Sequence, residues 1–275
     1  MPTSAPHALP VDASFDSAAG AVAPGSLLLI TGGSRGIGAA TARLAARAGW
    51  QVAINYTRDA PAAEQVADEL RALGVMAWTL QADVADEASV ERLFGQTDVL
   101  CARNGLSLRG FVNNAGVVDR AQRFDEMSGE RLRRMVSINL LGSLYGAREA
   151  VRRMSTHHGG AGGSIVNLSS VAARLGAPGQ YVDYAATKAA IETFTLGLAR
   201  EVANEGVRVN AVRPGIIDTE IHASGGQPER ARQLAPQIPM QRPGTAEEVA
   251  QAVLWLLSPA SSYTTGSVLD VTGGR

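Results

Sequence analysis

Two tyrosines and one lysine in the segment 180–190 are of the residue types that proton transfer requires. Tyr184 lies four residues before Lys188, and Tyr181 lies seven residues before it. On a helix both spacings bring the side chains near one face, so spacing alone leaves the choice of tyrosine open. A tyrosine can donate a proton to a carbonyl oxygen while the carbonyl carbon accepts a hydride. The segment therefore indicates acid/base chemistry on a carbonyl group or an alcohol.

The distance to the lysine separates the two tyrosines. A lysine ammonium ~4 Å from a tyrosine, at an effective dielectric near 20, contributes roughly 4 kcal/mol, on the order of three pKa units. This brings a tyrosine, with an ordinary pKa of about 10, near neutrality. Tyr184 is one helical turn from Lys188, whereas Tyr181 is two turns away, ~10 Å along the axis. Direct coupling favours Tyr184, and we interpret Tyr181 as pocket lining.

The elements that must position these residues alternate from Ser26 onward between short apolar runs and longer helical patterns. This alternation predicts an α/β fold, a single-domain Rossmann-type fold with one doubly wound parallel sheet of seven strands and helices on both faces. Strands are expected at 26–31, 50–56, 75–83, 108–116, 164–169, 207–214 and 267–272. The main helices are expected at 36–49, 61–74, 86–105, 128–158, 180–204 and 246–258.

Length and charge limit the class of protein. The 275 residues allow one large domain or two small ones, and we favour one domain over 26–275. Residues 1–25, rich in Ala, Pro and Ser, are predicted to be a weakly structured extension. A net charge of -1 with scattered charges does not favour nucleic acid or membrane. No apolar run reaches the ~18 residues of a membrane span. We therefore expect a small-molecule partner.

The content of cysteine and histidine argues against disulfides and metals. Cys101 is the only cysteine, which excludes an intrachain disulfide and a thiolate metal cluster and suits a reducing cytoplasm. His157 and His158 precede a glycine turn and have no metal-ligand partner at the right spacing. We expect no metal site and a cytoplasmic protein.

A glycine-rich turn, TGGSRGIG at 31–38, lies between the first expected strand and the first helix. Such a turn lets the backbone approach a pyrophosphate, and the helix N-terminus faces its negative charge. Gly32, Gly36 and Gly38 follow the spacing T-G-x-x-x-G-x-G instead of the common G-x-G-x-x-G. The turn predicts dinucleotide binding, and its unusual glycine spacing limits the families of dinucleotide-binding proteins to which the chain could belong.

Together with five later motifs in order, this turn resembles the short-chain dehydrogenase/reductase family. The motifs are NNAG at 113–116, SINLLG with Asn139, SIVNLSS ending in Ser170, YAATK with Tyr184 and Lys188, and RPGIIDT after the sixth strand. The resemblance runs from about Ser26 to the C-terminus. It implies an NAD(P)-dependent oxidoreductase that transfers a hydride between nicotinamide and a carbonyl or secondary alcohol of a small molecule.

The resemblance also implies the roles of individual residues. Tyr184 would be the general acid/base, and Lys188 would lower its pKa and bind the nicotinamide ribose. Ser170 would hydrogen-bond the substrate oxygen, and Asn139 would support a water-linked proton relay. Ser169 and Ser170 should face opposite sides of the strand end, and the resemblance selects Ser170. The residues expected to bind the cofactor are Gly32, Ser34, Arg35, Gly36, Ile37, Gly38, Asn55, Arg58, Asp83, Val84, Asn114, Ala115, Gly116, Tyr184, Lys188, Pro214, Gly215, Ile217 and Thr219.

The end of the second strand indicates the type of nicotinamide cofactor. An acidic residue commonly binds the ribose diol there and repels a 2'-phosphate, but this strand ends with Asn55. Arg58 and Arg35 add cations near the expected adenosine ribose. We therefore predict a preference for NADP(H), with NAD(H) as the alternative. Asp83 with Val84 resembles the family's adenine-contacting pair.

The segment 216–244 is the expected substrate lid, because it is rich in Gly and Pro and follows the strand that carries the nicotinamide contacts. It mixes Ile, Leu and Met with arginines and Glu220, and this mixture specifies no substrate. We interpret His222 as lid surface.

Several alternatives remain within and beyond the family. The chain resembles bacterial sugar-1-dehydrogenases and 3-oxoacyl carrier-protein reductases. Glu205 stands where a basic residue would help to bind an acidic carrier protein, although Arg152, Arg153 and Arg200 are near. A non-catalytic NAD(P)-binding sensor is the alternative of another class, and the complete Ser/Tyr/Lys set weighs against it. The resemblance implies a homotetramer first and a dimer second.

Overall fold

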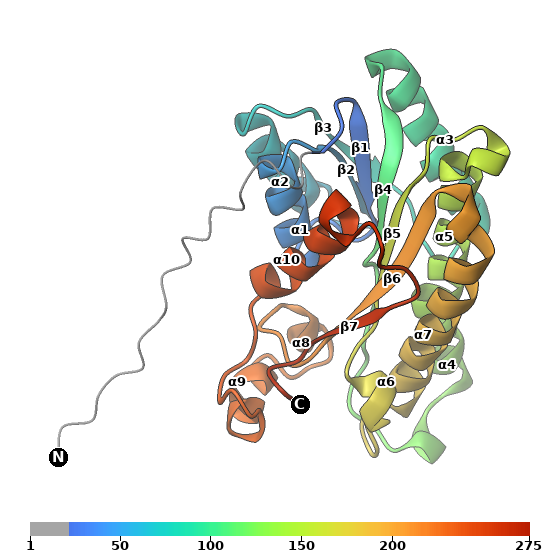
Figure 1. The fold of residues 1–275 in the computed structure, drawn as a ribbon. Coiled ribbons are helices and arrows are strands. Elements are labelled where there is room, and N and C mark those ends of the chain that lie inside the picture. Colours follow the sequence, from blue (N-terminus) through green and yellow to red (C-terminus); the bar gives the residue numbers. More distant parts are fainter. Residues whose placement is uncertain (1–21) are drawn as a thin grey trace.

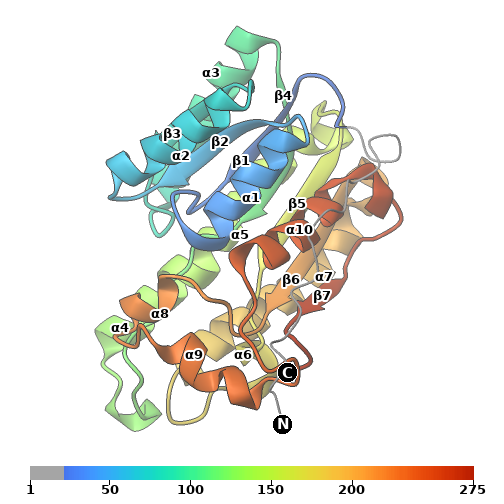
Figure 2. The same cartoon turned by 90° about the vertical axis from the view of Figure 1, so that its left-hand side faces the viewer.

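A parallel sheet of seven strands, in the order β3-β2-β1-β4-β5-β6-β7, forms the centre of the structure, a computed structural model that describes residues 22–275 (Figure 1). The strands are β1 (Ser26–Ile30), β2 (Gln51–Tyr56), β3 (Ala77–Gln81), β4 (Ser107–Asn113), β5 (Gly163–Leu168), β6 (Val207–Pro214) and β7 (Val268–Val271). Helices cover both faces (Figure 2). The predicted doubly wound α/β fold is confirmed.

Alternation along the strands divides the core into two layers. Leu28 and Ile30 of β1 pack toward one face, and Leu27 and Leu29 pack toward the other. Strands buried on both faces therefore have continuous apolar runs, such as SLLLI in β1. One layer contains α1 (Gly36–Arg47), α2 (Ala60–Ala72) and α10 (Ala246–Leu257), and the other contains α3 (Glu87–Asn104), α5 (Gly142–Met154) and α7 (Val182–Val202).

The stretch 128–158, expected as one helix, is interrupted. It consists of α4 (Gly129–Val136), a π-helical turn η2 (Ser137–Leu141), α5 and a short 3₁₀ turn η3 (Thr156–His158). Ser155 separates α5 from η3 with an extended backbone, and its carbonyl accepts hydrogen bonds from the amides of His158 and Gly160. The apolar periodicity could not predict the π turn, since one wider turn only shifts the register of the pattern.

The carboxyl ends of the central strands bring the sequence motifs to one edge of the sheet. The glycine turn follows β1, NNAG ends β4, Ser170 follows β5, and RPG ends β6. The chain order reverses between β1 and β4, which is where open α/β sheets bind ligands. The fold thus gathers the predicted site residues at its topological switch point.

The expected lid forms a separate lobe over this edge (Figure 2). It contains two short helices, α8 (Ile221–Ser224) and α9 (Arg230–Leu234), and the 3₁₀ turn η5 (Ala235–Gln237). A bridge between Ile217 and Gly244 joins its two ends. The remaining short elements are α6 (Ala172–Leu175), η1 (Phe124–Glu126), η4 (Ala203–Glu205) and η6 (Pro259–Ser261).

Residues 22–25, the end of the predicted extension, contact the domain before β1 begins at Ser26. Val22 packs against the core, and the carbonyl of Gly25 accepts a hydrogen bond from the amide of Ser107. The rest of the predicted extension, residues 1–21, lies outside the described residues. Over residues 22–275, no helix has the length and apolar character to cross a bilayer, and no three metal-ligating side chains are grouped together.

Candidate active site

Tyr184 and Ser170 meet at the carboxyl edge of the sheet. Tyr184 lies in the first turn of α7, and Ser170 lies two residues past the end of β5. Burial raises the pKa of the Tyr184 phenol, and the neighbouring Ser170 side chain, which can hydrogen-bond the phenol oxygen, offsets part of this rise. The structure therefore pairs the predicted proton donor with the predicted ligand of the substrate oxygen.

Lys188 is buried one turn further along α7. Its ammonium donates a hydrogen bond to the carbonyl of Leu168 at 2.6 Å and lies 5.7 Å from the centre of the Tyr184 ring. Burial lowers the pKa of Lys188 from 10.5 to about 8. The role of Lys188 in activating Tyr184 stays a prediction.

The two adjacent serines point to different partners. Ser169 is buried, and its hydroxyl lies 2.6 Å from Oε1 of Glu192 and 3.3 Å from the carbonyl of Lys188. Ser170 is partly exposed and faces Tyr184. This is the arrangement that alternation at the strand end predicts.

Asn139 lies in the π-helical turn and is completely buried. Its Oδ1 accepts a hydrogen bond from the amide of Val117 at 2.8 Å, and its Nδ2 donates one to the carbonyl of Val117 at 2.9 Å. A side chain added at Gly116 would lie 3.3 Å from Oδ1 of Asn139 and 3.6 Å from Nζ of Lys188. Asn139 and Lys188 therefore border the same small space beside Gly116. The water relay stays a prediction.

The NNAG motif holds the glycine turn from behind. Nδ2 of Asn114 donates hydrogen bonds to the carbonyls of Thr31 and Gly32, each at 2.9 Å. The hydroxyl of Thr31 accepts the amides of Asn114 and Ala115, each at 3.0 Å. Asn114 thus supports the predicted cofactor site through the backbone of the turn.

The turn has the form of a pyrophosphate cradle. A Cβ at Gly38 would lie only 2.4 Å from the carbonyl oxygen of Gly32, and Gly36 has a φ of +53°, so both positions require glycine. Arg35, the N-cap of α1, makes no side-chain capping bond. The first amides of α1 are therefore free of a side-chain cap and fit an anionic group.

Asn55 has a different position from the one expected for a ribose ligand. Only 1% of Asn55 is exposed, and its Nδ2 donates to the carbonyls of Leu80 and Ala82 at 3.2 and 3.0 Å. Its Oδ1 accepts the amide of Gly32 at 3.4 Å. The buried amide braces the glycine turn against β3, which does not suit direct contact with a ribose. Arg58 and Arg35 are both exposed.

The other predicted cofactor residues surround the same crevice. Asp83 is exposed and Val84 is buried after β3, while Pro214 ends β6. Gly215 lies against Thr272, where a Cβ would approach its Cα to 2.8 Å. Thr219 lies across from the glycine turn, since a Cβ at Gly36 would be 3.6 Å from it. Ser34 and Ile37 are partly buried in the turn, and Ile217 is buried at the base of the lid.

The segment predicted to be the lid contacts the start of α7. Arg230 of α9 donates a hydrogen bond from Nη2 to Oε1 of Gln180 at 2.6 Å, and its guanidinium lies 5.2 Å from the centre of the Tyr181 ring. The hydroxyl of Tyr181 donates to Oε1 of Gln227 at 3.4 Å. Tyr181 is thus buried under the lid, as expected for pocket lining.

His222 differs from the prediction of lid surface. It is half-buried, its Nε2 lies 2.9 Å from the carbonyl of Ile217, and burial lowers its pKa. This contact connects α8, which contains His222, to the segment around Ile217 that precedes it.

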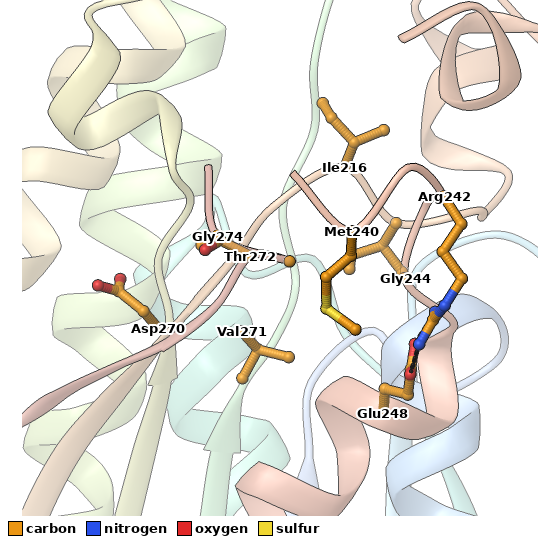
Figure 3. Close-up of a pocket in the computed structure, with 11 residues that line it drawn as sticks. Ile216, Met240, Arg242, Gly244, Glu248, Asp270, Val271, Thr272 and Gly274 are labelled. Carbon is orange, nitrogen blue, oxygen red and sulfur yellow. Dashed lines mark hydrogen bonds and ion pairs between the residues drawn. The ribbon is translucent and has the colours of Figure 1, made fainter. Parts of the chain in front are cut away.

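A cavity of about 270 Å³ lies between the segment 216–244, α10 and the C-terminal segment (Figure 3). Ile216, Met240 and Val271 contribute apolar surface, and an ion pair between Arg242 and Glu248 borders it. Its lining residues include Ile217 but not Tyr184 or Ser170. The cavity therefore adjoins the predicted nicotinamide contacts and lies outside the reacting centre.

A buried ion pair next to Tyr184 was not predicted. Arg131 of α4 holds Asp183 of α7 with two hydrogen bonds, of 2.8 and 3.1 Å, and also donates to the carbonyl of Arg120 at 2.6 Å. It ties the loop after β4 to the catalytic helix. No local signal identifies this contact, because the two charges are 52 residues apart.

The chain is similar to known oxidoreductases over nearly its whole length. A family model described as enoyl-(acyl carrier protein) reductase matches residues 32–275. An Escherichia coli K12 protein named uncharacterized oxidoreductase YgfF is 50% identical over 250 residues, covering 91% of this chain and 100% of that protein. The 3-oxoacyl-[acyl-carrier-protein] reductase FabG of Staphylococcus aureus is 36% identical over 253 residues, covering 90% of this chain and 96% of that protein.

A solved structure has the same fold. A short-chain dehydrogenase from Burkholderia cenocepacia, in complex with NADP, matches with a TM-score of 0.81 and 33% sequence identity. The match covers 91% of this chain and 97% of that chain. The similarity extends over nearly all of the described residues.

Proposed function

The chain belongs to the short-chain dehydrogenase/reductase family, and we propose that it is an NADP(H)-dependent oxidoreductase for a small carbonyl compound or secondary alcohol, with Tyr184 as its general acid/base. The observation that carries the proposal is the convergence of Ser170, Tyr184 and Lys188 at the switch point of the sheet. Family members are oxidoreductases that act on alcohols and carbonyl groups with NAD(P).

The chain's own residues have separate tasks in this reaction. The bound nicotinamide supplies or accepts the hydride. The Ser170 hydroxyl orients the substrate oxygen, and Tyr184 gives that oxygen its proton as negative charge develops. Lys188, charged for the most part at neutral pH because its pKa is about 8, stabilises the phenolate that remains.

Preference for NADP(H) rests on charge near the adenosine ribose. Arg35, in the glycine turn before α1, and Arg58, two residues after β2, are exposed cations, and β2 ends without an acidic side chain. A guanidinium suits a 2'-phosphate because it can form paired, charge-assisted hydrogen bonds. The NADP complex of the Burkholderia cenocepacia relative supports the same choice.

The proposal is tested by following NADPH and NADH oxidation with a panel of ketones, aldehydes and diketones. We expect turnover with NADPH at a higher kcat/KM than with NADH, and loss of turnover in Tyr184→Phe. Tight cofactor binding without turnover of any compound would favour the alternative, a non-catalytic NAD(P)-binding sensor.

A 3-oxoacyl carrier-protein reductase is the second candidate, favoured by the relative from Staphylococcus aureus. The basic residues that could hold an acidic carrier protein are mostly engaged: Arg152 pairs with Glu149 at 2.7 Å, and Arg153 with Asp98 at 2.7 Å. This disfavours carrier binding. Comparing kcat/KM for a 3-oxoacyl thioester on a carrier protein and on a short thiol would decide, since a carrier enzyme should strongly prefer the former.

Assembly as a homotetramer and a cytoplasmic location stay predictions. Sedimentation at micromolar concentration tests the first, and a lone monomer would contradict both the tetramer and the dimer.

A further inference from the structure

The catalytic face of α7 continues past Lys188 to a carboxylate. Tyr184, Lys188 and Glu192 follow one another at intervals of four residues and so line one side of the helix. Glu192 therefore lies one turn from the ammonium that acts on Tyr184 and two turns from Tyr184 itself. A free carboxylate at this position would compete with Tyr184 for the charge of Lys188.

The structure pairs this carboxylate with an arginine from the sheet. Arg213 of β6 donates from Nε to Oε1 of Glu192 at 2.8 Å and from Nη2 to Oε2 at 2.6 Å. The Ser169 hydroxyl donates to Oε1 at 2.6 Å. The side chains of Arg213 and Glu192 are only 11% and 17% exposed. The contact is bidentate and largely shielded from solvent, the geometry in which an ion pair is strongest.

The pair continues into a neutral cluster of four charges. Arg213 lies directly opposite Asp270 in the ladder between β6 and β7 and contacts its Oδ1 at 2.6 Å. The other oxygen of Asp270 contacts Arg174 of α6 at 3.1 Å. The charges of two carboxylates and two guanidiniums cancel. This charge cluster (Arg174, Glu192, Arg213 and Asp270) therefore has no net charge.

The same contacts attach the catalytic helix to the sheet where Lys188 is held. Ser169 follows Leu168, whose carbonyl accepts the Lys188 ammonium at 2.6 Å. The amide of Ser169 donates to the carbonyl of Val212 at 2.8 Å, next to Arg213. Displacement of Glu192 would therefore shift α7 relative to the carbonyl that positions Lys188.

We propose that the Glu192–Arg213 ion pair is a positioning element for the reaction: it fixes α7 on the ends of β5 and β6, and Arg213 cancels the field of Glu192 at Lys188 and Tyr184. The inference rests on the proposed role of Tyr184. Glu192 and Arg213 act through Lys188 and Tyr184 and touch no reacting atom.

The substitutions leave the other charged or titratable groups around the site in place. They are Arg131 and Asp183, paired between α4 and α7, His222 and Arg230 in the lid, and Arg174 and Asp270 within the charge cluster. A neutral residue at position 192 changes the net charge of the charge cluster to +1, and a neutral residue at position 213 changes it to -1.

The test uses the three variants Glu192→Gln, Arg213→Met and their double combination. The pH dependence of kcat/KM for alcohol oxidation reports the coupled ionisation of Tyr184 and Lys188, whose pKa is about 8. Arg213→Met leaves a net negative charge, which disfavours the phenolate, and should shift the pH profile to higher pH. Glu192→Gln leaves a net positive charge, which favours the phenolate, and should shift the profile to lower pH. Two helical turns, ~12 Å, at an effective dielectric of about 20 to 40 give a shift of roughly 0.5 to 1 pH unit. The double variant should return close to the wild-type profile.

Arg153→Met is the control. It removes a partly buried arginine that pairs with Asp98 of α3 and Glu149 of α5, and it should leave the profile in place. If the substitutions acted only through lost packing, the pH profiles of both single variants would shift in the same direction or would not shift. Either result would overturn the proposal.

Ultraviolet difference absorbance gives a second measurement that needs no substrate. Subtracting the spectrum of the same variant with Tyr184→Phe isolates the phenolate signal of Tyr184. We expect the same opposite shifts and the same recovery in the double variant. If the wild-type protein turns over no compound, the proposed function fails, while this titration still decides whether the ion pair controls Tyr184. Equal ionisation of Tyr184 in all variants would refute the inference.

Discussion

The buried ammonium of Lys188 donates a hydrogen bond of 2.6 Å to the carbonyl of Leu168 at the end of β5. Only 4% of Lys188 is exposed, and burial lowers its pKa to about 8. The single contact holds the side chain beneath Tyr184 but does not compensate for the loss of hydration. Burial of the Lys188 ammonium therefore lowers the free energy of unfolding, a loss of stability that follows from its position in the site.

Lys188→Met should therefore stabilise the protein while removing activity. Since the folded pKa lies below 10.5, the unfolded chain binds more protons between about pH 8 and pH 10.5, and wild-type stability rises with pH there. At pH 7 we expect the variant to gain about 2 kcal/mol, because roughly 3 kcal/mol of charge burial is offset by about 1 kcal/mol for the hydrogen bond.

Urea unfolding of both proteins at neutral pH and near pH 10 measures this difference. The advantage of Lys188→Met should nearly vanish at the higher pH. A variant that is less stable by the same amount at both pH values would show that Lys188 carries no burial penalty.

Tyr184→Phe and Tyr181→Phe should have unequal effects. Tyr184→Phe removes the proton donor and should lower kcat by at least about 100-fold, with little change in the dissociation constant of NADPH. Tyr181→Phe loses only a long hydrogen bond to Gln227 and keeps the ring under Arg230. Steady-state kinetics and cofactor titration of both variants check this, and the reverse order of effects would contradict the assignment of the acid/base.

Removing the two exposed cations near β2 should change cofactor choice. In Arg35→Ala/Arg58→Ala we expect the KM for NADPH to rise about 10-fold or more, since a charged hydrogen bond contributes roughly 1.5–3 kcal/mol. The KM for NADH should change little. Arg103→Ala, an exposed arginine of α3, is the control. A parallel rise for both cofactors would point to a general effect on the crevice instead of recognition of the 2'-phosphate.

Asn55→Leu should weaken both cofactors equally and destabilise the fold. The change removes the partner of the Gly32 amide and the Asn55 hydrogen bonds to the carbonyls of Leu80 and Ala82, in a buried place. The expected loss is about 2–4 kcal/mol in the free energy of unfolding. Asn104→Leu, at an exposed asparagine of α3 that bonds the carbonyl of Leu100, should cost far less. A selective change in the NADPH/NADH ratio in Asn55→Leu would instead favour direct contact with the ribose.

Several features of the site could be predicted from the sequence because they are local. Apolar runs and glycines mark each strand and the turn after it, and carboxyl ends of parallel strands share one edge of the sheet. This was enough to bring the glycine turn, NNAG, Ser170 and Tyr184 together. The four-residue spacing also predicted that Tyr184 is the nearer tyrosine to Lys188, because one helical turn brings the two side chains to neighbouring positions.

Other features depended on how the elements pack. Asn55 was expected at the cofactor, but the exposed or buried state of a residue at a strand end depends on the neighbouring strand and turn, here β3 and the glycine turn. The same holds for the π turn around Asn139 and for Glu192, whose partner Arg213 is 21 residues away. Sequence periodicity determined the order of the elements and the motifs they present. Only the tertiary structure decided which charges are paired beneath the catalytic helix, because such contacts arise between segments whose spacing in the chain carries no information about their distance in space.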